Sequence, residues 1–321
     1  MRIEHTDFGL RGGRARLPFA RSPSLAPTLA RSIRTRPALT GPFVMPRALA
    51  SPTILVFDSG LGGLTVYREV AKARPDARFV YAADDALFPY GDIEDGKLTA
   101  RVLAVMESLI AAHQPDLVVI ACNTASTIAL PSLRARFSVP FVGTVPAIKP
   151  ACAASQSKLV SVLGTEATVK REYTRALIRE FAQGCDVTLV GSPRLAGFAE
   201  AELHGKPASD AEIGAEIAPC FVENGAERTD TVVLACTHYP LLLDRLRRLA
   251  PWPVTFLDPA PAIARRVVEL IGSAQGRKAG QPARAVFTAG RAPSPVLSAA
   301  LGGFGIAEIA AEKFDLPSLS A

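Results

Sequence analysis

Two stretches, VVIAC at residues 118–122 and VVLAC at residues 232–236, decide the fold that this sequence of 321 residues predicts. Each begins as a short aliphatic and β-branched run, which is typical of a strand buried on both faces of a parallel sheet. Each run delivers a cysteine at its carboxyl end, and polar residues follow. The likeness of the two stretches indicates a diverged internal duplication, and therefore two similar α/β lobes.

Strands and helices are predicted to alternate on both sides of these stretches. In the first half we expect strands over 53–58, 79–83, 117–121 and 141–145, and helices over 64–73 and 97–113. In the second half we expect strands over 159–163, 187–190 and 231–235, helices over 168–183, 210–223 and 258–272, and a strand-helix unit over 285–301. This alternation predicts parallel sheets with covering helices.

The same pattern predicts how the chain is divided. We expect a first lobe from residues 51–146 plus 258–316 and a second lobe from residues 147–257. Ligands of open parallel α/β sheets bind beyond the carboxyl ends of the strands. Polar residues occupy such ends at Asp58-Ser59, Cys122-Asn123-Thr124, Gly164-Thr165 and Cys236-Thr237-His238. Two lobes facing each other would place the two cysteines on opposite walls of one cleft.

The positive charge of the chain is concentrated in residues 1–50. This leader holds nine arginines and two acids, a charge of +7, whereas residues 51–321 hold 27 basic and 28 acidic side chains, a charge of −1. A nearly neutral globular part gives no footprint for nucleic acid. Since the leader is too rich in Arg, Pro and Ser to bury a core, we expect a disordered extension or an unused upstream start, with Met45 as a natural start. Its composition also resembles that of an organelle transit peptide.

Composition and cysteine usage favour a compact cytoplasmic enzyme. Hydrophobic residues make up 49% of the chain. No run approaches the roughly 20 apolar residues of a membrane span, so we expect no membrane association. The five cysteines are odd in number and include no CxxC pair, which argues against a disulfide framework or a zinc ribbon. Cys152, Cys185 and Cys220 are expected to be small buried side chains.

Two opposed thiols can invert a stereocentre by proton transfer. One thiol takes a proton from one face, the other delivers a proton to the opposite face, and the roles exchange with direction. A cysteine suits this task when a neighbouring positive or hydrogen-bonding group lowers its pKa from about 8.5. His238 lies two residues from Cys236, and Asp58 ends a strand expected beside that of Cys122. The pattern therefore predicts an acid/base pair with a polar helper for each thiol.

Six motifs between about Ile54 and Phe314 occur in the order of one known family. They are FDSGLGG at 57–63, FPYG at 88–91, ACNTAS at 121–126, VPAIKP at 145–150, GTEAT at 164–168 and ACTHYPLL at 235–242. With these motifs the chain resembles the glutamate racemase family, two-thiol enzymes that make D-glutamate for bacterial peptidoglycan. The resemblance implies two facing α/β lobes with the active site between them, glutamate as the small-molecule substrate, and no cofactor or metal. It leaves the oligomeric state open, with a homodimer as one candidate.

The resemblance also implies roles for single residues. Cys122 would take the α-proton of D-glutamate with help from Asp58, and Cys236 that of L-glutamate with help from His238. Glu200 matches a family carboxylate near the second thiol. The positions that match substrate-binding residues of the family are Asp58, Ser59, Tyr90, Gly91, Asn123, Thr124, Thr237 and His238. Backbone amides and hydroxyls at these positions would neutralise carboxylates without a metal.

Two stretches depart from the family's common pattern. Gly191-Ser192-Pro193 stands where the family often has Gly-Cys-Pro, and unusual residues follow at 194–197. Residues 84–87, Asp-Asp-Ala-Leu, differ from the common wording before Pro-Tyr-Gly.

Other interpretations of the same residues stay open. A racemase of aspartate or a hydantoin would share the pattern, whereas a decarboxylase on the same scaffold would dispense with one thiol. A metal-binding regulatory protein could use Cys122, Cys236 and His238 as ligands. A protein acting through its Arg-rich leader could bind nucleic acid or a partner. The glycines at 60–63 lack the spacing of phosphate-binding and dinucleotide loops, so a tight turn approaching a carboxylate is expected, and Asp58 could also cap a helix.

Overall fold

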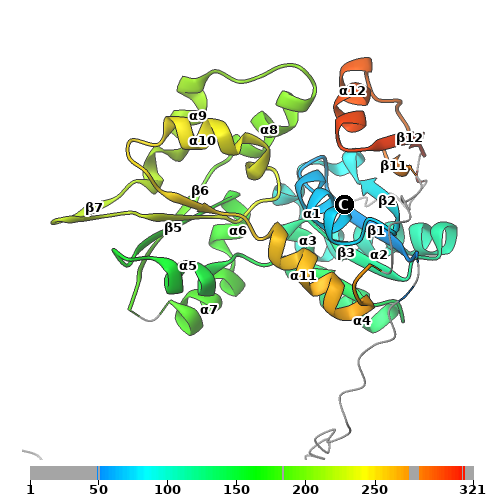
Figure 1. Ribbon diagram of the computed structural model, residues 1–321, viewed down its shortest axis with the longest axis horizontal. Coiled ribbons are helices and arrows are strands. Elements are labelled where there is room, and N and C mark those ends of the chain that lie inside the picture. The colour runs from blue at the N-terminus through cyan, green and yellow to red at the C-terminus, as the bar shows by residue number, and fades with distance from the viewer. Residues whose placement is uncertain (1–48, 50, 183, 275–281, 313, 315–321) are drawn as a thin grey trace, which may run out of the picture. The chain divides into compact units, whose positions relative to one another are not determined.

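The computed structural model describes residues 49, 51–182, 184–274, 282–312 and 314, which are the coloured parts of Figure 1. The expected leader over 1–50 lies outside these residues, apart from Leu49. The backbone of Leu49 donates to the carbonyl of Ile271 and accepts from the buried Arg74 side chain.

Strands and helices alternate along most of the chain, as the sequence predicts. The strands are β1 (Thr53–Asp58), β2 (Arg78–Ala83), β3 (Leu117–Ile120), β4 (Phe141–Gly143), β5 (Leu159–Gly164), β6 (Asp186–Gly191), β7 (Glu223–Asn224), β8 (Glu227–Arg228), β9 (Thr231–Leu234), β10 (Thr255–Leu257), β11 (Ala283–Phe287) and β12 (Ile306–Ala311). The α-helices are α1 (Leu64–Ala73), α2 (Asp95–His113), α3 (Asn123–Ile128), α4 (Leu130–Arg136), α5 (Ile148–Ala154), α6 (Glu166–Lys170), α7 (Glu172–Phe181), α8 (Leu195–Leu203), α9 (Asp210–Ile217), α10 (Leu243–Leu249), α11 (Ala260–Ile271) and α12 (Pro295–Gly303). Short 3-10 turns are η1 (Asp85–Leu87), η2 (Tyr90–Asp92), η3 (Ala218–Cys220) and η4 (Tyr239–Leu242).

The two main sheets share one strand order. The first sheet runs β12-β11-β2-β1-β3-β4 and the second β10-β9-β5-β6, and every pairing within them is parallel. Within both, the first strand in the chain lies between the second and the third, and a fourth strand flanks the third. The cysteines follow the third strand of each set, β3 and β9. This confirms the predicted pair of similar parallel α/β sheets, and the common order matches the duplication hypothesis.

Helices cover both faces of each sheet, because alternate residues of the strands point to opposite sides. In β1, Ile54 and Val56 pack with α1, α11 and α12, whereas Leu55 and Phe57 pack with α2, α3 and α4. The second sheet is covered by α8, α9 and α10 on one face and by α5 and α7 on the other. We refer to each sheet with its covering helices as the first and the second lobe.

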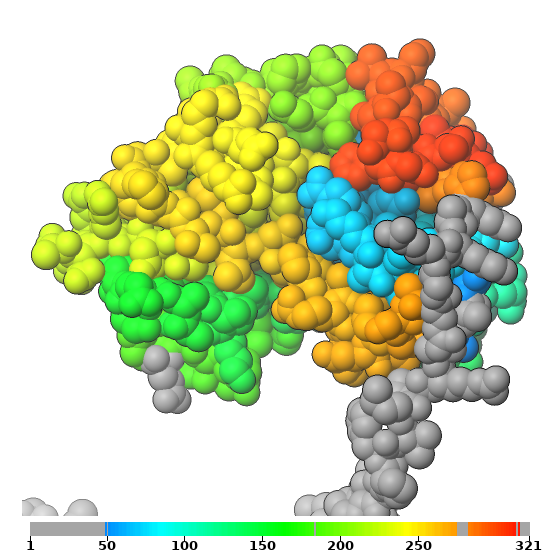
Figure 2. Space-filling view, in the orientation of Figure 1, coloured from blue at the N-terminus to red at the C-terminus, as the bar shows by residue number. Residues whose placement is uncertain are grey.

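The chain passes between the lobes twice. It leaves the first sheet after β4 and enters the second lobe at α5, and it returns after β10 through α11, which packs against α1. Strands β11 and β12 then extend the first sheet beside β2. The final segment therefore lies next to the N-terminal strands and helices, as the neighbouring red and blue surfaces in Figure 2 show.

Several predicted elements have different bounds. The helix expected over 168–183 is two helices, α6 and α7, because Arg171 adopts an extended backbone between them. The helix expected over 210–223 ends at Ile217, since Pro219 lacks the N–H that would continue it. The strand expected over 141–145 ends at Gly143, and the N–H of Thr144 donates to Ser126 instead. The strands that were not predicted are β7, β8, β10 and β12, and the helices that were not predicted are α3, α4, α5, α8 and α10.

Candidate active site

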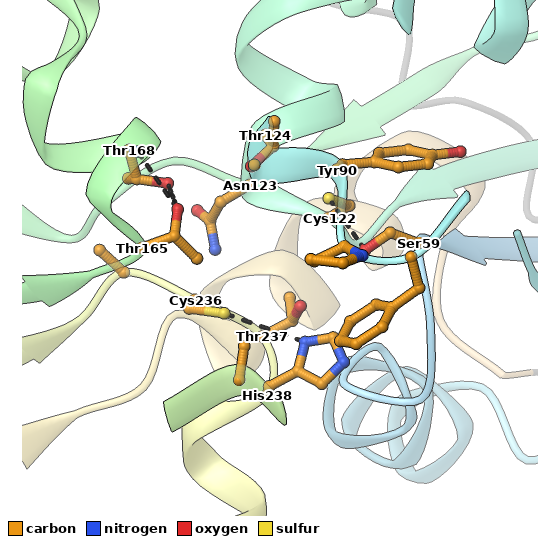
Figure 3. A pocket seen from close by; sticks show the side chains of 15 residues that line it. Ser59, Tyr90, Cys122, Asn123, Thr124, Thr165, Thr168, Cys236, Thr237 and His238 are labelled. Atoms are coloured by element: carbon orange, nitrogen blue, oxygen red, sulfur yellow. Dashed lines mark hydrogen bonds between the residues drawn. The ribbon is translucent and has the colours of Figure 1, made fainter. Parts of the chain in front are cut away.

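One pocket lies between the carboxyl ends of the two sheets and brings the two cysteines together. Cys122, after β3, and Cys236, after β9, both line it and are almost fully buried. In Figure 3 the two sulfurs belong to different lobes, and the Asn123 side chain lies between the lobes. The residues that line the pocket are Ser59, Phe88, Pro89, Tyr90, Gly91, Cys122, Asn123, Thr124, Thr165, Thr168, Ala196, Ala235, Cys236, Thr237 and His238.

The turn after β1 joins the two lobes behind the pocket. Asp58 is fully buried, and its carboxylate accepts hydrogen bonds from the N–H of Gly63 at 3.0 Å and the hydroxyl of Thr237 at 3.3 Å. A Cβ atom on Gly62 would come within 2.4 Å of the His238 ring, so only glycine allows this approach. Burial raises the pKa of Asp58, and the nearby His238 charge acts in the opposite direction. The glycine turn therefore holds the Asp58 carboxylate and the second lobe together.

Cys122 lies in surroundings that keep its thiol protonated. The thiol donates to Ser59 Oγ at 3.7 Å and accepts from the N–H of Ala125 at 3.5 Å, so it caps the first turn of α3. Burial raises the pKa of the Cys122 thiol to about 12, and the negative charge of Asp58 acts in the same direction. Cys122 therefore holds its proton at neutral pH.

Cys236 faces the imidazole ring of His238. Its Sγ lies 3.9 Å from Nδ1 of His238, whose Nε2 lies 2.8 Å from the carboxylate of Glu200. Burial acts to lower the pKa of His238, but the hydrogen bonds to Cys236 and Glu200 outweigh it and raise this pKa well above its ordinary value. His238 therefore carries a proton at neutral pH, and an imidazolium beside a cysteine stabilises the thiolate.

Two groups lie within hydrogen-bonding distance of Nε2 of His238, and only one of them can be its partner. The N–H of Gly62 also points at Nε2, at 3.2 Å. A nitrogen that donates its proton to Glu200 has no lone pair left for a second donor. The Glu200 contact is shorter and joins opposite charges, so it defines the ring as a donor at Nε2. Glu200 also accepts from the N–H of Leu61, which ties α8 to the glycine turn.

The structure sorts the predicted site residues into two groups. Ser59, Tyr90, Gly91, Asn123, Thr124, Thr237 and His238 line the pocket with the two cysteines. Asp58 and Glu200 lie behind it: no hydrogen bond joins Asp58 to the Cys122 sulfur, and Glu200 reaches Cys236 only through His238. Both amide atoms of Asn123 are buried without a hydrogen-bond partner, so this side chain is free to bind a ligand.

Six lining residues were not predicted as site residues, namely Phe88, Pro89, Thr165, Thr168, Ala196 and Ala235. A signal existed for Thr165, because it follows β5 in the same way that the cysteines follow β3 and β9. The ring of Phe88 packs against that of His238, with 5.1 Å between the ring centroids. This contact joins the two lobes, and no local pattern indicates it.

Neither a metal cluster nor a membrane helix is found in the part of the chain that the structure describes. Among these residues, no group of three His, Cys, Asp or Glu side chains is placed to hold a metal ion, which gives no support to the metal-binding alternative. None of the helices in the same ranges is both long and apolar enough to cross a bilayer.

The fold and the site define a two-lobed parallel α/β protein with one thiol on each wall of a shared pocket. Residues 59–267 match the model of the Asp/Glu/hydantoin racemase family, which is about two thirds of the chain. The chain belongs to this family and is an isomerase, a racemase.

Named relatives agree with this assignment. The chain is similar to the glutamate racemase of Brucella anthropi, at 58% identity over 228 residues, 71% of this chain and 82% of that protein. It is 55% identical to the glutamate racemase of Brucella ovis over 256 residues, which cover 79% and 92% of the two chains. Its fold matches that of Escherichia coli glutamate racemase, solved with L-glutamate and the activator UDP-MurNAc-ala, with a TM-score of 0.75 and 39% identity over 82% of this chain and 98% of that one.

Proposed function

We propose that this protein is a glutamate racemase that interconverts L- and D-glutamate by proton transfer between Cys122 and Cys236, without a cofactor. The observation that carries the proposal is the pair of buried thiols on opposite walls of one pocket. Inversion at Cα needs a base on one face of the substrate and an acid on the other, and two cysteines supply both. The substrate is proposed from the relatives, which are glutamate racemases.

The protonation states proposed for the free enzyme suit L-glutamate. The imidazolium of His238 stabilises a thiolate at Cys236, which takes the α-proton of the L-enantiomer. The Cys122 thiol, whose pKa burial raises to about 12, then gives its proton to the opposite face of the carbanion. The reverse reaction needs a thiolate at Cys122 and a thiol at Cys236, the less favoured distribution of the same proton.

Neutral donors would bind the carboxylates of the substrate. The unpartnered amide of Asn123 points into the pocket, and hydroxyls of Ser59, Thr124 and Thr165 lie around it. Such donors stabilise negative charge in the ground state and at the carbanion without adding a competing cation.

The pocket must widen before substrate enters. Its volume in this conformation is about 30 Å³, enough for water-sized groups and too small for an amino acid. The two chain passages between the lobes, after β4 and after β10, are the places where a change of lobe angle would be absorbed. We therefore propose that glutamate enters an opened form and reacts in a closed one.

The product would serve peptidoglycan synthesis in the cytoplasm. This role follows from the resemblance to the glutamate racemase family, and the five free cysteines fit a reducing compartment.

The test supplies L-glutamate and L-aspartate separately to the full chain in D₂O, with a reductant and no cofactor. Chiral chromatography follows the D-enantiomer, and NMR follows deuterium at Cα. We expect D-glutamate with solvent deuterium at Cα and little or no reaction of aspartate. Reaction of aspartate alone would change the substrate, and the absence of exchange with either amino acid from folded, reduced protein would overturn the proposal.

A further inference from the structure

A buried carboxylate next to the pocket has more hydrogen-bond donors than any role described so far requires. Asp84 is fully buried and receives Arg101 through two nitrogens, at 2.6 and 3.0 Å. The hydroxyls of Tyr90 and Thr288 donate to its two oxygens, each at 2.5 Å. These partners come from η2, α2 and the end of β11, so one side chain joins three separate parts of the first lobe. Asp84 is also the first of residues 84–87, which differ from the family's common sequence.

The Tyr90 hydroxyl is committed to Asp84 and unavailable to the substrate. Tyr90 lines the pocket, but in Figure 3 its hydroxyl points away from the two cysteines. Burial raises the pKa of Tyr90 well above its ordinary value, and the negative charge of Asp84 acts in the same direction, so the phenol remains a donor. What Tyr90 offers to the pocket is therefore its ring and backbone.

The segment tied down in this way forms one wall of the pocket. Phe88, Pro89, Tyr90 and Gly91 all line it, and Phe88 also contacts the His238 ring of the second lobe. Next to Asp84, the Asp85 carboxylate accepts from the N–H of Ala289 at 2.8 Å, which fastens the start of the same segment to the strand end of β11. The wall is thus anchored from behind by carboxylates of residues 84 and 85.

We propose that Asp84 is a positioning residue, which holds the wall formed by residues 88–91 in its binding-competent position through the Tyr90 hydroxyl. This inference rests on the proposed racemase function. If the tether is cut, the wall is in place for only a fraction of the time, and the apparent affinity for substrate falls by that fraction. The reaction of bound substrate is unchanged, because the thiols and their helpers are not touched.

Kinetics of Tyr90→Phe test the proposal, because this variant keeps the ring and removes only the tether. We expect KM for glutamate to rise about tenfold, the equivalent of one hydrogen bond to a charged group, with kcat within about threefold of wild type. The matched control is Tyr67→Phe, the same change at a buried tyrosine of the first lobe that does not line the pocket, and it should leave KM unchanged. A lower unfolding temperature with wild-type KM would show a merely structural role and overturn the proposal.

A double-mutant cycle shows whether Asp84 and Tyr90 act through one bond. Asp84→Asn should raise KM as Tyr90→Phe does, and the double variant should show little further increase. Additive effects, or an Asp84→Asn protein with wild-type KM, would mean that the Tyr90 hydroxyl acts without Asp84. If Asp84→Asn fails to fold because Arg101 is left unpaired, Thr288→Val removes another donor to Asp84 without changing charge, and a smaller rise in KM is expected.

A spectroscopic measurement separates this proposal from the proposed function. The Tyr90 hydroxyl proton, buried in a short hydrogen bond, should give a downfield proton resonance that disappears in Tyr90→Phe and shifts in Asp84→Asn. It should move little when D-glutamate is added. An inactive wild type would overturn only the proposed function. Absence of this resonance from the wild type, or its indifference to Asp84→Asn, would overturn the positioning role.

Discussion

The two halves of the pocket begin alike and end differently. Strands β3 and β9 are both four residues long, fully buried and followed by Ala-Cys. After Cys122 the chain starts helix α3 at once, and the sulfur accepts from the N–H of Ala125. After Cys236 the chain makes a turn into η4 instead, and this turn brings the His238 ring back to 3.9 Å from the sulfur. The residues after the cysteine, and not the strand before it, set the surroundings of each thiol.

This difference gives the two thiols unequal electrostatic surroundings. Asp58 lies near Cys122 and raises its pKa, after the larger effect of burial, whereas His238 with Glu200 offers Cys236 a positive charge. The inequality cannot favour one direction in kcat/KM. L- and D-glutamate have equal free energies, so the equilibrium constant between them is one, and the kcat/KM values of the forward and reverse reactions must be equal. It shows instead in the separate kcat and KM values, in isotope effects and in partial reactions of variants.

Replacing either cysteine tests the two-thiol comparison most strongly. Cys122→Ser and Cys236→Ser should each lower racemisation by about three orders of magnitude or more, because each removes the acid/base group of one face. The remaining thiol can still take a proton from its own face and return one. In D₂O, Cys122→Ser should therefore exchange the α-proton of L-glutamate without inversion, and Cys236→Ser that of D-glutamate.

Cys185→Ser is the matched control for these variants, since Cys185 is a free cysteine outside the pocket, and it should racemise glutamate at the wild-type rate. Racemisation by either catalytic variant near the wild-type rate would contradict the two-thiol mechanism. Exchange of the opposite enantiomer would reverse the assignment of the two faces.

Most strands of the two main sheets, and the edge at which the pocket lies, could be predicted from the sequence because they follow from local patterns. The runs before Cys122 and Cys236 are apolar enough to be strands in any context, and strand ends in parallel sheets meet at one edge. The strand β12 was missed because it is an edge strand with largely exposed side chains, which leaves no alternating pattern. The break at Arg171 was missed because that residue has no local reason to leave the helix: it pairs with Asp95 of the first lobe.

Contacts between distant residues were beyond any local pattern. Glu200 and His238 are 38 positions apart, and only the resemblance indicated that they serve one thiol. The hydrogen bond of Tyr90 to Asp84, in contrast, was not indicated by the resemblance either. Tyr90 was expected to bind substrate, but no pattern indicated that its hydroxyl donates to Asp84.

Glu200→Gln tests the surroundings of the second thiol, Cys236. The change removes the charge that raises the pKa of His238, so this pKa should fall towards its ordinary value. The imidazolium is then lost at a lower pH, and the alkaline limb of the pH profile of kcat/KM should move to lower pH. At pH 8 we expect a loss of about tenfold, comparable to one charge-assisted hydrogen bond.

Glu200→Gln should also change how the stability of the folded protein depends on pH. A raised pKa of His238 stabilises the folded state fully below the ordinary histidine pKa of about 6.5, and the stabilisation is lost as pH rises through the raised value. Glu200→Gln should reduce it. Glu202→Gln, on the same helix but paired with Arg245, is the control and should leave the pH profile in place. A Glu200→Gln profile that coincides with the wild type would show that this carboxylate does not set the charge of His238.

Asp58→Asn should have the smallest effect on rate and the clearest effect on the Cys122 side. The side-chain carbonyl that replaces the carboxylate can still accept from the N–H of Gly63, so the turn is kept, but the charge that raises the pKa of Cys122 is gone. We expect alkylation of Cys122 by iodoacetamide at pH 9 to accelerate several-fold, because more of the thiol is ionised, and racemisation to fall by about tenfold or less. Alkylation of Cys236 in the same sample, followed by mass spectrometry, is the internal control and should change less.

Stability gives an independent measure of the same charge. Because burial raises the pKa of Asp58, the folded wild type binds this proton more tightly than the unfolded chain does. Its stability is therefore greatest below the ordinary aspartate pKa of about 3.9 and falls as pH rises through the raised value. Asp58→Asn has no such titration, so its unfolding temperature should gain on that of the wild type across this window and stay higher at neutral pH. If the two proteins keep a constant difference from pH 4 to pH 8, and Cys122 reacts equally fast in both, the buried charge of Asp58 is not what distinguishes the first thiol from the second.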